Sequence, residues 1–529
     1  MSVIYLGKWF GHRAGAQASV VLRRQVPIRF DEPARSWFGG LPRMPDNIAW
    51  PRVAKGAPLH FIAQIACEDL PKQIWNGRGP RDGWLLLFVD VLQMEDDSEG
   101  LLSLLAEAWQ GEDESEARLI RVLHVDRLGP ERQPPDDMPT VRHALADHIG
   151  QFEPQIRDGV PKLWRRWPVD LVVQEVPSPS ADGETNWEPA EVTGAELYGA
   201  PEDDENIDHF AEAEPRPLTW RGALYVTEAL LRTFSTDKFG YEHNFKHNSG
   251  GLATEPQWEP GWLARSLARL EASVAQHAAG LAQATTTLQQ CPPEASPAER
   301  ASLENDVLYR RGLHSDAEPK LANMAGLSQQ WTEDALAAEI ARVGAAHMSW
   351  VDMQRSGLER MRKDILTQDL DALMGDERWA AMKAELIAAE TEYWTNFDGS
   401  PECVQLRTTR MTLFDYAQSG LKFALREDLL DLYSRSAAAQ ASIPAALRAE
   451  LEPKLRHVSR SSTPHRMGGP RDVMQGWADP DDDDLLFQIG SDDAMGWMWG
   501  DLGALTVYLS PLYLKVRWFK RADARIDGH

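Results

Sequence analysis

Four polar or aromatic residues occupy comparable places near the two ends of the chain and could line a binding cleft. Gln64 and Gln488 each lie near the end of an apolar, strand-like run, and Trp499 and Asp501 lie in a turn after the second run. Carboxamide and carboxylate groups bind ligands through directed hydrogen bonds, and pockets favour boundaries between subdomains. We therefore predict a ligand-binding cleft of Gln64, Gln488, Trp499 and Asp501. The alternative is that these side chains bind neighbouring backbone and stabilise their own turns.

Two clusters of potential metal ligands are present, and neither has the full pattern of a metal site. His243 and His247 lie beside Glu242 at a spacing that places both imidazoles on one face of a helix, as zinc requires. Glycine and asparagine residues around them oppose a helix. The acidic run 481–484 lacks the alternating ligands and central glycine of a calcium loop. We therefore expect no metal and no cofactor.

The motifs of common catalytic and nucleotide-binding sites are missing from the chain. It contains no glycine-rich phosphate loop, no dinucleotide fingerprint after a strand and no nucleophile elbow. Ser235 and Lys238 fit the short Ser-x-x-Lys pattern, but the partner motifs of that pattern do not occur. The sequence therefore indicates no catalytic residue.

The elements that must position the predicted cleft occur twice, in the same order. Each copy has a Gly-Gly turn with a nearby proline, a tryptophan, an apolar run ending in Gln-Ile, and a glycine before a second apolar run. The turn precedes the glutamine by 24 residues in the first copy (Gly40 to Gln64) and by 19 in the second (Gly469 to Gln488). This ordered match predicts an internal duplication.

Short apolar runs between turn residues predict that the duplicated core is rich in strands. The unbroken run 84–89 is typical of a strand covered on both faces. Similar runs occur at 20–22, 59–65, 119–125, 171–176, 485–489 and 505–509. We predict an α+β fold in which residues 1–205 and 460–529 form one core.

A long helical insertion, predicted at 255–456, interrupts this core. Apolar residues spaced by three and four form one stripe from Leu263 to Leu281 and another from Leu336 to Ile365, the pattern of packed helices. His277 and His347 lie on these stripes, where a histidine is more typical of a core than of a metal site. We predict that the two stripes pair as an antiparallel hairpin or small bundle.

The remaining parts of the insertion follow from composition and turn residues. Residues 206–254 are predicted to be a linker, and residues around 291–330 a connection that is long for a helical hairpin. Further helices are expected at about 376–396, 404–436 and 444–456.

The charge of the chain limits its partners. The 529 residues carry a formal net charge of −26, which disfavours binding to nucleic acid and to anionic membranes. No apolar run is long enough to cross a membrane, no secretory leader is recognisable, and three cysteines do not suggest a disulfide framework. We therefore expect a cytoplasmic protein. Residues 181–215 contain 12 acids and no Lys or Arg, which fits a solvated loop or a docking loop for a basic partner.

The turns and strands quoted above resemble those of a known family. Residues 38–42, Trp50-Pro51 and 60–65 resemble the N-terminal motif of the YwqG-like family, a bacterial family of uncharacterised function. Residues 469–476, 485–493 and 498–503 resemble its C-terminal motif. The helical block is a departure, because typical members are shorter. The resemblance implies a mixed α+β, internally duplicated core, and it implies no known reaction, cofactor or catalytic residue.

These observations favour a binding or protein-interaction module whose helical insertion docks a protein partner. High tryptophan content supports this hypothesis, because 20 tryptophans are available for recognition surfaces as well as for the core. One alternative is an enzyme whose site lies at the seam between the two repeats. Another is an immunity-like protein that neutralises a basic toxin through its acidic loops. The oligomeric state is open.

Overall fold

The fold is described from a computed structural model of the chain. The residues described are 17–53, 56–90, 120–138, 163–176, 216–234, 261–293, 295–396, 406–456, 465–469, 471, 483–497, 499 and 503–527. They form two compact units, one made of 1–218 and 422–529 and the other of 219–421. Within the described ranges, no helix is both long and apolar enough to cross a membrane.

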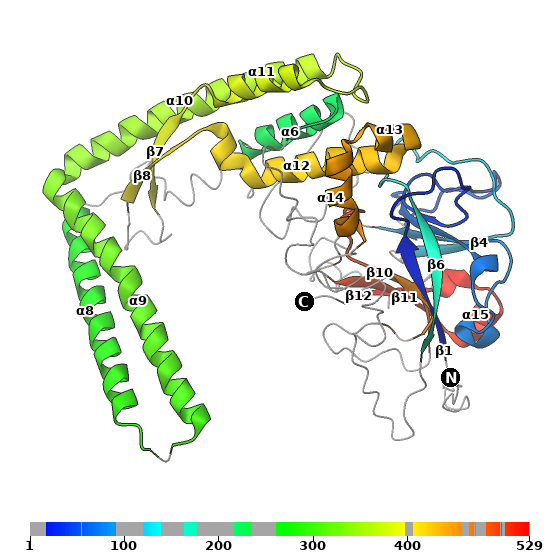
Figure 1. The fold of residues 1–529 in the computed structure, drawn as a ribbon, viewed down its shortest axis with the longest axis horizontal. Coiled ribbons are helices and arrows are strands. Elements are labelled where there is room, and N and C mark those ends of the chain that lie inside the picture. Colours follow the sequence, from blue (N-terminus) through cyan, green and yellow to red (C-terminus); the bar gives the residue numbers. More distant parts are fainter. Residues whose placement is uncertain are drawn as a thin grey trace. The chain divides into compact units, whose positions relative to one another are not determined.

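The first unit is built on one ten-stranded antiparallel sheet (Figure 1). Its strand order is β12-β11-β10-β9-β1-β6-β2-β3-β4-β5. The strands nearest the N-terminus are β1 (Gln17–Arg24), β2 (Trp37–Phe38), β3 (His60–Ala66), β4 (Trp84–Val89), β5 (Ile120–Val125) and β6 (Trp167–Val176). The strands after the insertion are β9 (Arg466–Met467), β10 (Asp484–Gly490), β11 (Ala504–Leu509) and β12 (Asp523–Asp527).

This strand order consists of two equivalent halves that meet at the β1–β6 pair. One half is β6-β2-β3-β4-β5 and the other is β1-β9-β10-β11-β12. In each half, one long strand pairs with the first strand of a four-stranded meander. Val20 pairs with Met467 as Trp167 pairs with Phe38. Three residues after Val20 and Trp167, the chain reaches Arg23 and Asp170, which pair with each other. A pseudo-two-fold axis therefore passes through the Arg23–Asp170 pair, and the predicted α+β core with an internal duplication is confirmed.

The Gly-Gly turns repeat the same close backbone contact in both halves. Gly39 and Gly468 have φ values of +55° and +66°, which favour glycine. A Cβ on Gly39 would lie 2.2 Å from the carbonyl oxygen of Arg165, and one on Gly468 would lie 2.9 Å from that of Ala18. Arg165 and Ala18 are equivalent positions, two residues before Trp167 and Val20. The turn therefore needs glycine because the meander packs against the long strand there.

Each half also anchors its first short strand in the same way. The hydroxyl oxygen of Ser36 accepts a hydrogen bond from the backbone N–H of Ala66 at 2.9 Å. At the equivalent place, Nδ1 of His465 accepts one from the N–H of Gly490 at 3.1 Å. The duplication thus extends from strand order to individual hydrogen bonds, although the side chains have diverged.

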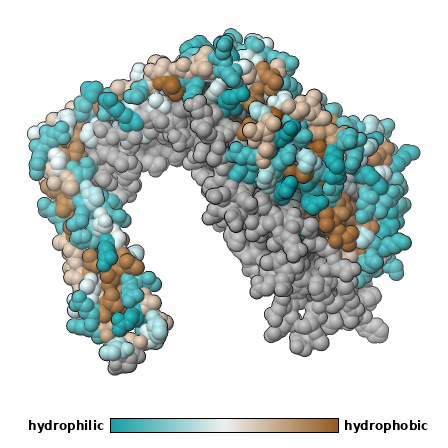
Figure 2. All heavy atoms as spheres, viewed as in Figure 1, coloured by the Kyte–Doolittle hydropathy of each residue, from teal (hydrophilic) through white to brown (hydrophobic). Residues whose placement is uncertain are grey.

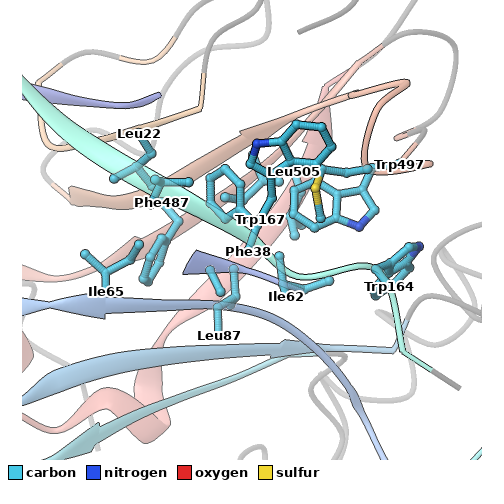
Figure 3. Packing of buried hydrophobic residues seen from close by; sticks show 14 of the residues in the cluster. Leu22, Phe38, Ile62, Ile65, Leu87, Trp164, Trp167, Phe487, Trp497 and Leu505 are labelled. Carbon is cyan, nitrogen blue, oxygen red and sulfur yellow. The ribbon is translucent and has the colours of Figure 1, made fainter. Parts of the chain in front are cut away.

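The two halves share one hydrophobic core. Figure 3 shows side chains of both halves packed together, with Phe38, Ile62, Leu87 and Trp167 from the first and Phe487, Trp497 and Leu505 from the second. Tryptophans in the loops cross between the halves. Trp75 donates its indole N–H to the carbonyl of Leu485 at 2.7 Å, and Trp497 packs edge-on against Phe38 with centroids 5.3 Å apart. These contacts make the halves parts of one folding unit.

Helices that follow the insertion also complete this core. They are α12 (Leu413–Arg435), α13 (Ala437–Ser442) and α14 (Ala445–Leu455). Tyr433 stacks on Trp167 with centroids 5.8 Å apart, and Leu451 and Leu455 are buried in the same cluster. The sheet unit therefore resumes at residue 422, whereas the sequence places its second part at 460–529. Helical periodicity identifies a helix but not the surface against which the helix packs.

The second unit contains long helices and a small hairpin. Its elements are α6 (Trp220–Thr233), α8 (Trp262–Gln289), α9 (Pro297–Gln330), α10 (Glu333–Ile365), α11 (Asp376–Ile387), β7 (Thr391–Asn396) and β8 (Leu406–Met411). A core at the base of α8, α9 and α10 contains Trp262, Leu270, Met324 and Ile340. α6 lies within the predicted linker 206–254, and β7 and β8 replace parts of the helices expected at 376–396 and 404–436.

The antiparallel helical hairpin is formed by α8 and α9, not by the two apolar stripes. Residues around 291–330 were expected to form a connection, but 297–330 form the helix α9. The helix begins with a capping box, in which Ser296 and Glu299 bind each other's backbone N–H groups, and Pro297 occupies the first turn. This local signal is visible in the sequence. The predicted pairing of 263–281 with 336–365 as one hairpin is therefore wrong, whereas the small-bundle alternative is confirmed, because Leu263 and Leu270 share a core with Leu336 and Ile340.

Candidate functional site

The two predicted glutamines occupy equivalent strand positions, but the structure does not bring them together. In both halves the strand pairing slips by one residue just before the glutamine. The next residues, Ile65 and Ile489, belong to the shared core. Because side chains alternate along a strand, Gln64 and Gln488 point to the opposite face of the sheet. Four strands separate β3 from β10, so these side chains do not meet at a seam. Their ligand-binding role stays a prediction.

Gln64 is held in a closed polar environment. Its Oε1 accepts a hydrogen bond from the backbone N–H of Arg43 at 2.9 Å. Its Nε2 and the indole N–H of its cross-strand neighbour Trp37 are buried, with no hydrogen-bond partner among the residues described. The guanidinium of Arg166 covers the Trp37 ring at 4.3 Å. Gln64 and Trp37 are fully buried, so a ligand could reach them only after these neighbours move.

Trp499 is a core residue in the loop between β10 and β11. It is 1% exposed, and its backbone N–H donates to the hydroxyl of Ser491 at 2.9 Å. The same hydroxyl donates to the carbonyl of Gly503 at 2.8 Å. Ser491 therefore closes the loop that was predicted to turn around Asp501. Asp501 itself lies outside the described residues.

A buried ionic cluster that the sequence did not reveal lies beside this loop. Asp492 Oδ2 accepts hydrogen bonds from Arg24 Nε at 2.7 Å and from His465 Nε2 at 2.9 Å. Its Oδ1 accepts the N–H groups of Ala494 and Met495. Arg24 is in β1 and Asp492 follows β10, 468 residues later. Asp492 falls within the motif at 485–493, but Arg24 belongs to no motif, so only the tertiary structure shows the cluster.

The protonation states in this cluster follow from its contacts. Nδ1 of His465 accepts the Gly490 N–H, so its Nε2 carries the hydrogen that is donated to Asp492. Burial lowers the pKa of His465 despite the opposing effect of the carboxylate. Burial alone would raise the pKa of Asp492, but the charge of Arg24 and the hydrogen bond from His465 hold that pKa below its ordinary value. A neutral histidine thus lies beside an Arg–Asp ion pair.

The His465–Asp492 pair resembles a catalytic dyad, but a substrate cannot reach these buried side chains in this conformation. The side chains of Asp492 and His465 are completely buried, and that of Arg24 is 3% exposed. Phe38 and Trp497 pack on the His465 ring with centroids 4.8 and 5.7 Å away. In this conformation the cluster therefore joins β1 to the loop after β10, within the second half of the sheet.

The structure supports no metal site at the candidate metal ligands that it describes. His243 and His247 lie outside the described residues, as does the Ser235–Lys238 motif. In the part of the chain that the structure describes, no group of three or more His, Cys, Asp or Glu residues could hold a metal ion. His347 is buried, and its Nδ1 lies 2.9 Å from the hydroxyl of Thr391. Asp484, from the acidic run, forms an ion pair with Arg78 at 2.9 Å.

An exposed apolar surface lies in the connection between β11 and β12. Leu512, Val516 and Trp518 are 66%, 61% and 45% exposed, although they fall within seven residues of one another. Lys515 and Lys520 are also exposed there, and Arg517 and Arg521 add two further cations. We call residues 511–521 the carboxyl-terminal patch.

The carboxyl-terminal patch is held in a defined conformation. The short helix α15 (Pro511–Lys515) is capped by Ser510, and the side chains of Leu514 and Phe519 anchor it in the shared core. Arg517 adopts φ +56°, an unusual value for a residue with a side chain. Because the backbone turns there, Val516 and Trp518 remain exposed on either side of Arg517 while Phe519 is buried.

A comparison with models of protein families assigns the chain to one family. The family model described as "Domain of unknown function (DUF1963)" matches residues 36–261 and 376–527, more than two thirds of the sequence. The chain belongs to the DUF1963 family. No curated protein shows a significant match to it.

The DUF1963 match covers strands β2 to β12, and thus nearly the whole sheet. It also covers the carboxyl-terminal patch. The internal stretch without a match, 262–375, contains α8, α9 and α10. The helical block that interrupts DUF1963 in this chain is therefore shorter than the predicted insertion at 255–456.

Proposed function

We propose that this DUF1963 protein is a protein-interaction module that docks a partner on the carboxyl-terminal patch. The observation that supports this function is the exposure of Leu512, Val516 and Trp518 beside one another in the sequence. Apolar clusters rimmed by polar groups mark interaction sites, and tryptophan often supplies much of the binding energy. The predicted site residues Gln64, Gln488 and Trp499 are buried in comparison.

The helical block provides a second candidate for the docking element. Residues 272–293, in the second part of α8 and the turn after it, contain no Asp, Glu, Lys or Arg. Leu308 and Tyr309 on α9 are 59% and 64% exposed. Figure 2 shows hydrophobic residues on the surface of this helix pair. Interface centres are depleted of charge, so this surface suits a helix of a partner protein.

Two alternatives have less support. An enzyme site at the seam would need accessible polar groups, whereas Gln64, Gln488, His465 and Asp492 are all buried. An immunity-like protein would bind a basic toxin through segment 181–215, which lies outside the described residues. The described patch is basic and suits an acidic partner better.

The subgroup within the family, the type of organism and the cellular location are further parts of the proposal. We propose that the chain is a YwqG-like member of DUF1963 from a bacterium, on the motifs quoted above. A cytoplasmic location is supported by Cys67 and Cys291, which are free thiols, because reducing compartments keep thiols unpaired. Binding to nucleic acid or to membranes is not part of the proposal, since the net charge is −26.

Partner capture with matched variants tests the proposal. Tagged full-length protein, a patch variant (Leu512→Ser, Val516→Ser, Trp518→Ser) and a helix variant (Leu308→Ser, Tyr309→Ser) are compared in a native lysate. All five positions are exposed, so both variants should fold like the parent, as melting curves can verify. We expect the patch variant alone to lose the partner. Loss with the helix variant alone would place docking on the helical block, and equal capture by all three proteins would refute both surfaces.

A further inference from the structure

We infer that the carboxyl-terminal patch recognises an acidic polypeptide segment that carries bulky apolar side chains. This inference rests on the proposed function, because it specifies the partner of the same surface. It depends on three features: the positive charge of the patch, its exposed apolar side chains with an oriented Trp518, and the negative charge of the rest of the protein.

The local charge of the patch is opposite to that of the whole chain. Residues 511–522 contain four Lys or Arg and no Asp or Glu, whereas the chain carries −26. Lys515 and Lys520 are exposed. Arg517 pairs with Asp82 at 3.1 Å, in an ion pair whose side chains are 43% and 63% exposed. Incoming carboxylates can therefore bind the exposed lysines and can replace Asp82 on Arg517.

The largest apolar side chain of the patch, Trp518, is held in place by its neighbours. Trp518 packs edge-on against Tyr513 at 5.2 Å, and Arg521 lies over its ring at 5.0 Å. Its backbone N–H donates to the carbonyl of Tyr513 at 2.8 Å. An indole that is already oriented loses little conformational freedom on binding. Leu512, Val516 and Trp518 can therefore receive apolar side chains of a segment whose carboxylates meet Lys515 and Lys520.

An acidic segment suits the patch better than an anionic bilayer does. A bilayer would approach a wide area of the molecule, and the net charge of −26 would oppose that approach. A peptide segment meets only the patch, and charges more than about 10 Å away are screened at ordinary salt concentrations. The same reasoning disfavours long polyanions such as nucleic acids.

Labelled synthetic peptides of equal length test this inference on the full-length protein. The first peptide combines Asp and Glu with Leu and Phe, the second has Ser in place of the apolar residues, and the third has Lys in place of the acids. Vesicles of phosphatidylserine and phosphatidylcholine form a separate arm. We expect the first peptide to bind most tightly, with an affinity that falls as salt is added.

Two charge-reversal variants identify the binding surface. Lys515→Glu with Lys520→Glu should weaken binding of the first peptide by about tenfold or more. Arg311→Glu with Lys363→Glu changes net charge equally at exposed positions of the helical unit and should leave binding unchanged. The patch variant Leu512→Ser, Val516→Ser, Trp518→Ser should weaken it as well.

The outcomes separate this inference from the proposed function. If partner capture needs the patch but the first peptide binds no better than the third, the patch docks a partner of other chemistry and the inference is overturned. Patch-dependent binding of vesicles without binding of the first peptide would overturn it in favour of a lipid surface. If capture does not depend on the patch, the proposed docking site itself fails.

Discussion

Asp492 connects the first described strand to the last part of the sheet, because its carboxylate binds Arg24 and His465 at the same time. The equivalent acid in the first half is Glu68, since Cys67 and Ser491 donate to Gly83 and Gly503 in the same way. Glu68 pairs with Arg35 at the surface. One ancestral position has thus become a buried ion pair in one half and a solvated one in the other.

Replacing Asp492 by Asn should destabilise the protein strongly. The substitution leaves the buried Arg24 guanidinium without a full countercharge, and breaking a buried pair typically costs about 3–5 kcal/mol. Glu68→Gln at the equivalent, exposed position should cost no more than about 1 kcal/mol. Urea unfolding of both variants measures the difference. Similar small losses would show that the buried cluster does not hold β1 to the loop after β10 as described.

His347 should make the stability of the helical unit depend on pH. Burial lowers the pKa of His347 from 6.5 to about 4. Between these values the unfolded chain binds a proton that the folded chain does not, so stability falls as pH drops from about 6.5 towards 4. The loss approaches about 3 kcal/mol, from 1.36 kcal/mol per pKa unit.

The variant His347→Gln lacks this proton equilibrium. Melting temperatures of the parent and the variant, measured between pH 7 and pH 4, should therefore converge as the pH falls, because only the parent loses the contribution of His347. Parallel curves across that range would show that the imidazole is protonated as easily in the folded protein as in the unfolded one.

At the scale of elements, sequence patterns identified strands better than helix partners. Runs such as 84–89 and 505–509 became strands because each is apolar, short and bounded by turn residues. α9 was missed because its apolar residues, which include the exposed Leu308 and Tyr309, are not gathered on one face and form no clear stripe. Its capping box at Ser296 was the available signal.

The outer part of the α8–α9 pair should be removable. Among the described residues between 275 and 316, only Ala284 and Val307 are buried, whereas Leu270, Met324 and Leu327 at the base pack with α10. We expect replacement of 275–316 by a short Gly/Ser turn to leave the melting temperature nearly unchanged. Circular dichroism should show a loss of helix in proportion to the residues removed. Loss of cooperative melting would mean that the outer part supports the rest of the unit.

At the scale of the molecule, the duplication could be predicted and the division into units could not. Gln64 and Gln488 gave the correct equivalence because repeated turns and strands survive in order. The two glutamines do not meet as predicted, because the long strands β1 and β6 lie between the two meanders. No local sequence pattern shows that these strands take the central positions. The Arg24–Asp492 pair was missed because it joins residues far apart in sequence. The carboxyl-terminal patch was missed because the net charge of the whole chain, −26, conceals its local positive charge.

Two deletions distinguish the compact units from the predicted insertion. Replacing 219–421 by a flexible linker should leave a folded sheet domain, because loop length adds little closure entropy. Replacing 255–456 should prevent folding, because it also removes Tyr433, Leu451 and Leu455 from the core. Cooperative thermal melting of the purified proteins measures both. A stable domain from the larger deletion would show that α12 to α14 are dispensable.

The N-terminal strand β1 belongs to the half of the sheet that is otherwise formed by the C-terminal strands β9 to β12. This arrangement has a consequence for synthesis of the protein. β1 pairs with β9, and Val20 and Met467 meet only after 447 further residues have been added. At about 5–20 residues per second, β1 waits roughly 20–90 s for that partner on the ribosome. Its other neighbour, β6, emerges much earlier and pairs with it along eight residues. The nascent chain therefore exposes one edge of β1 throughout most of translation, and chaperones that bind unpaired strands have their longest opportunity there.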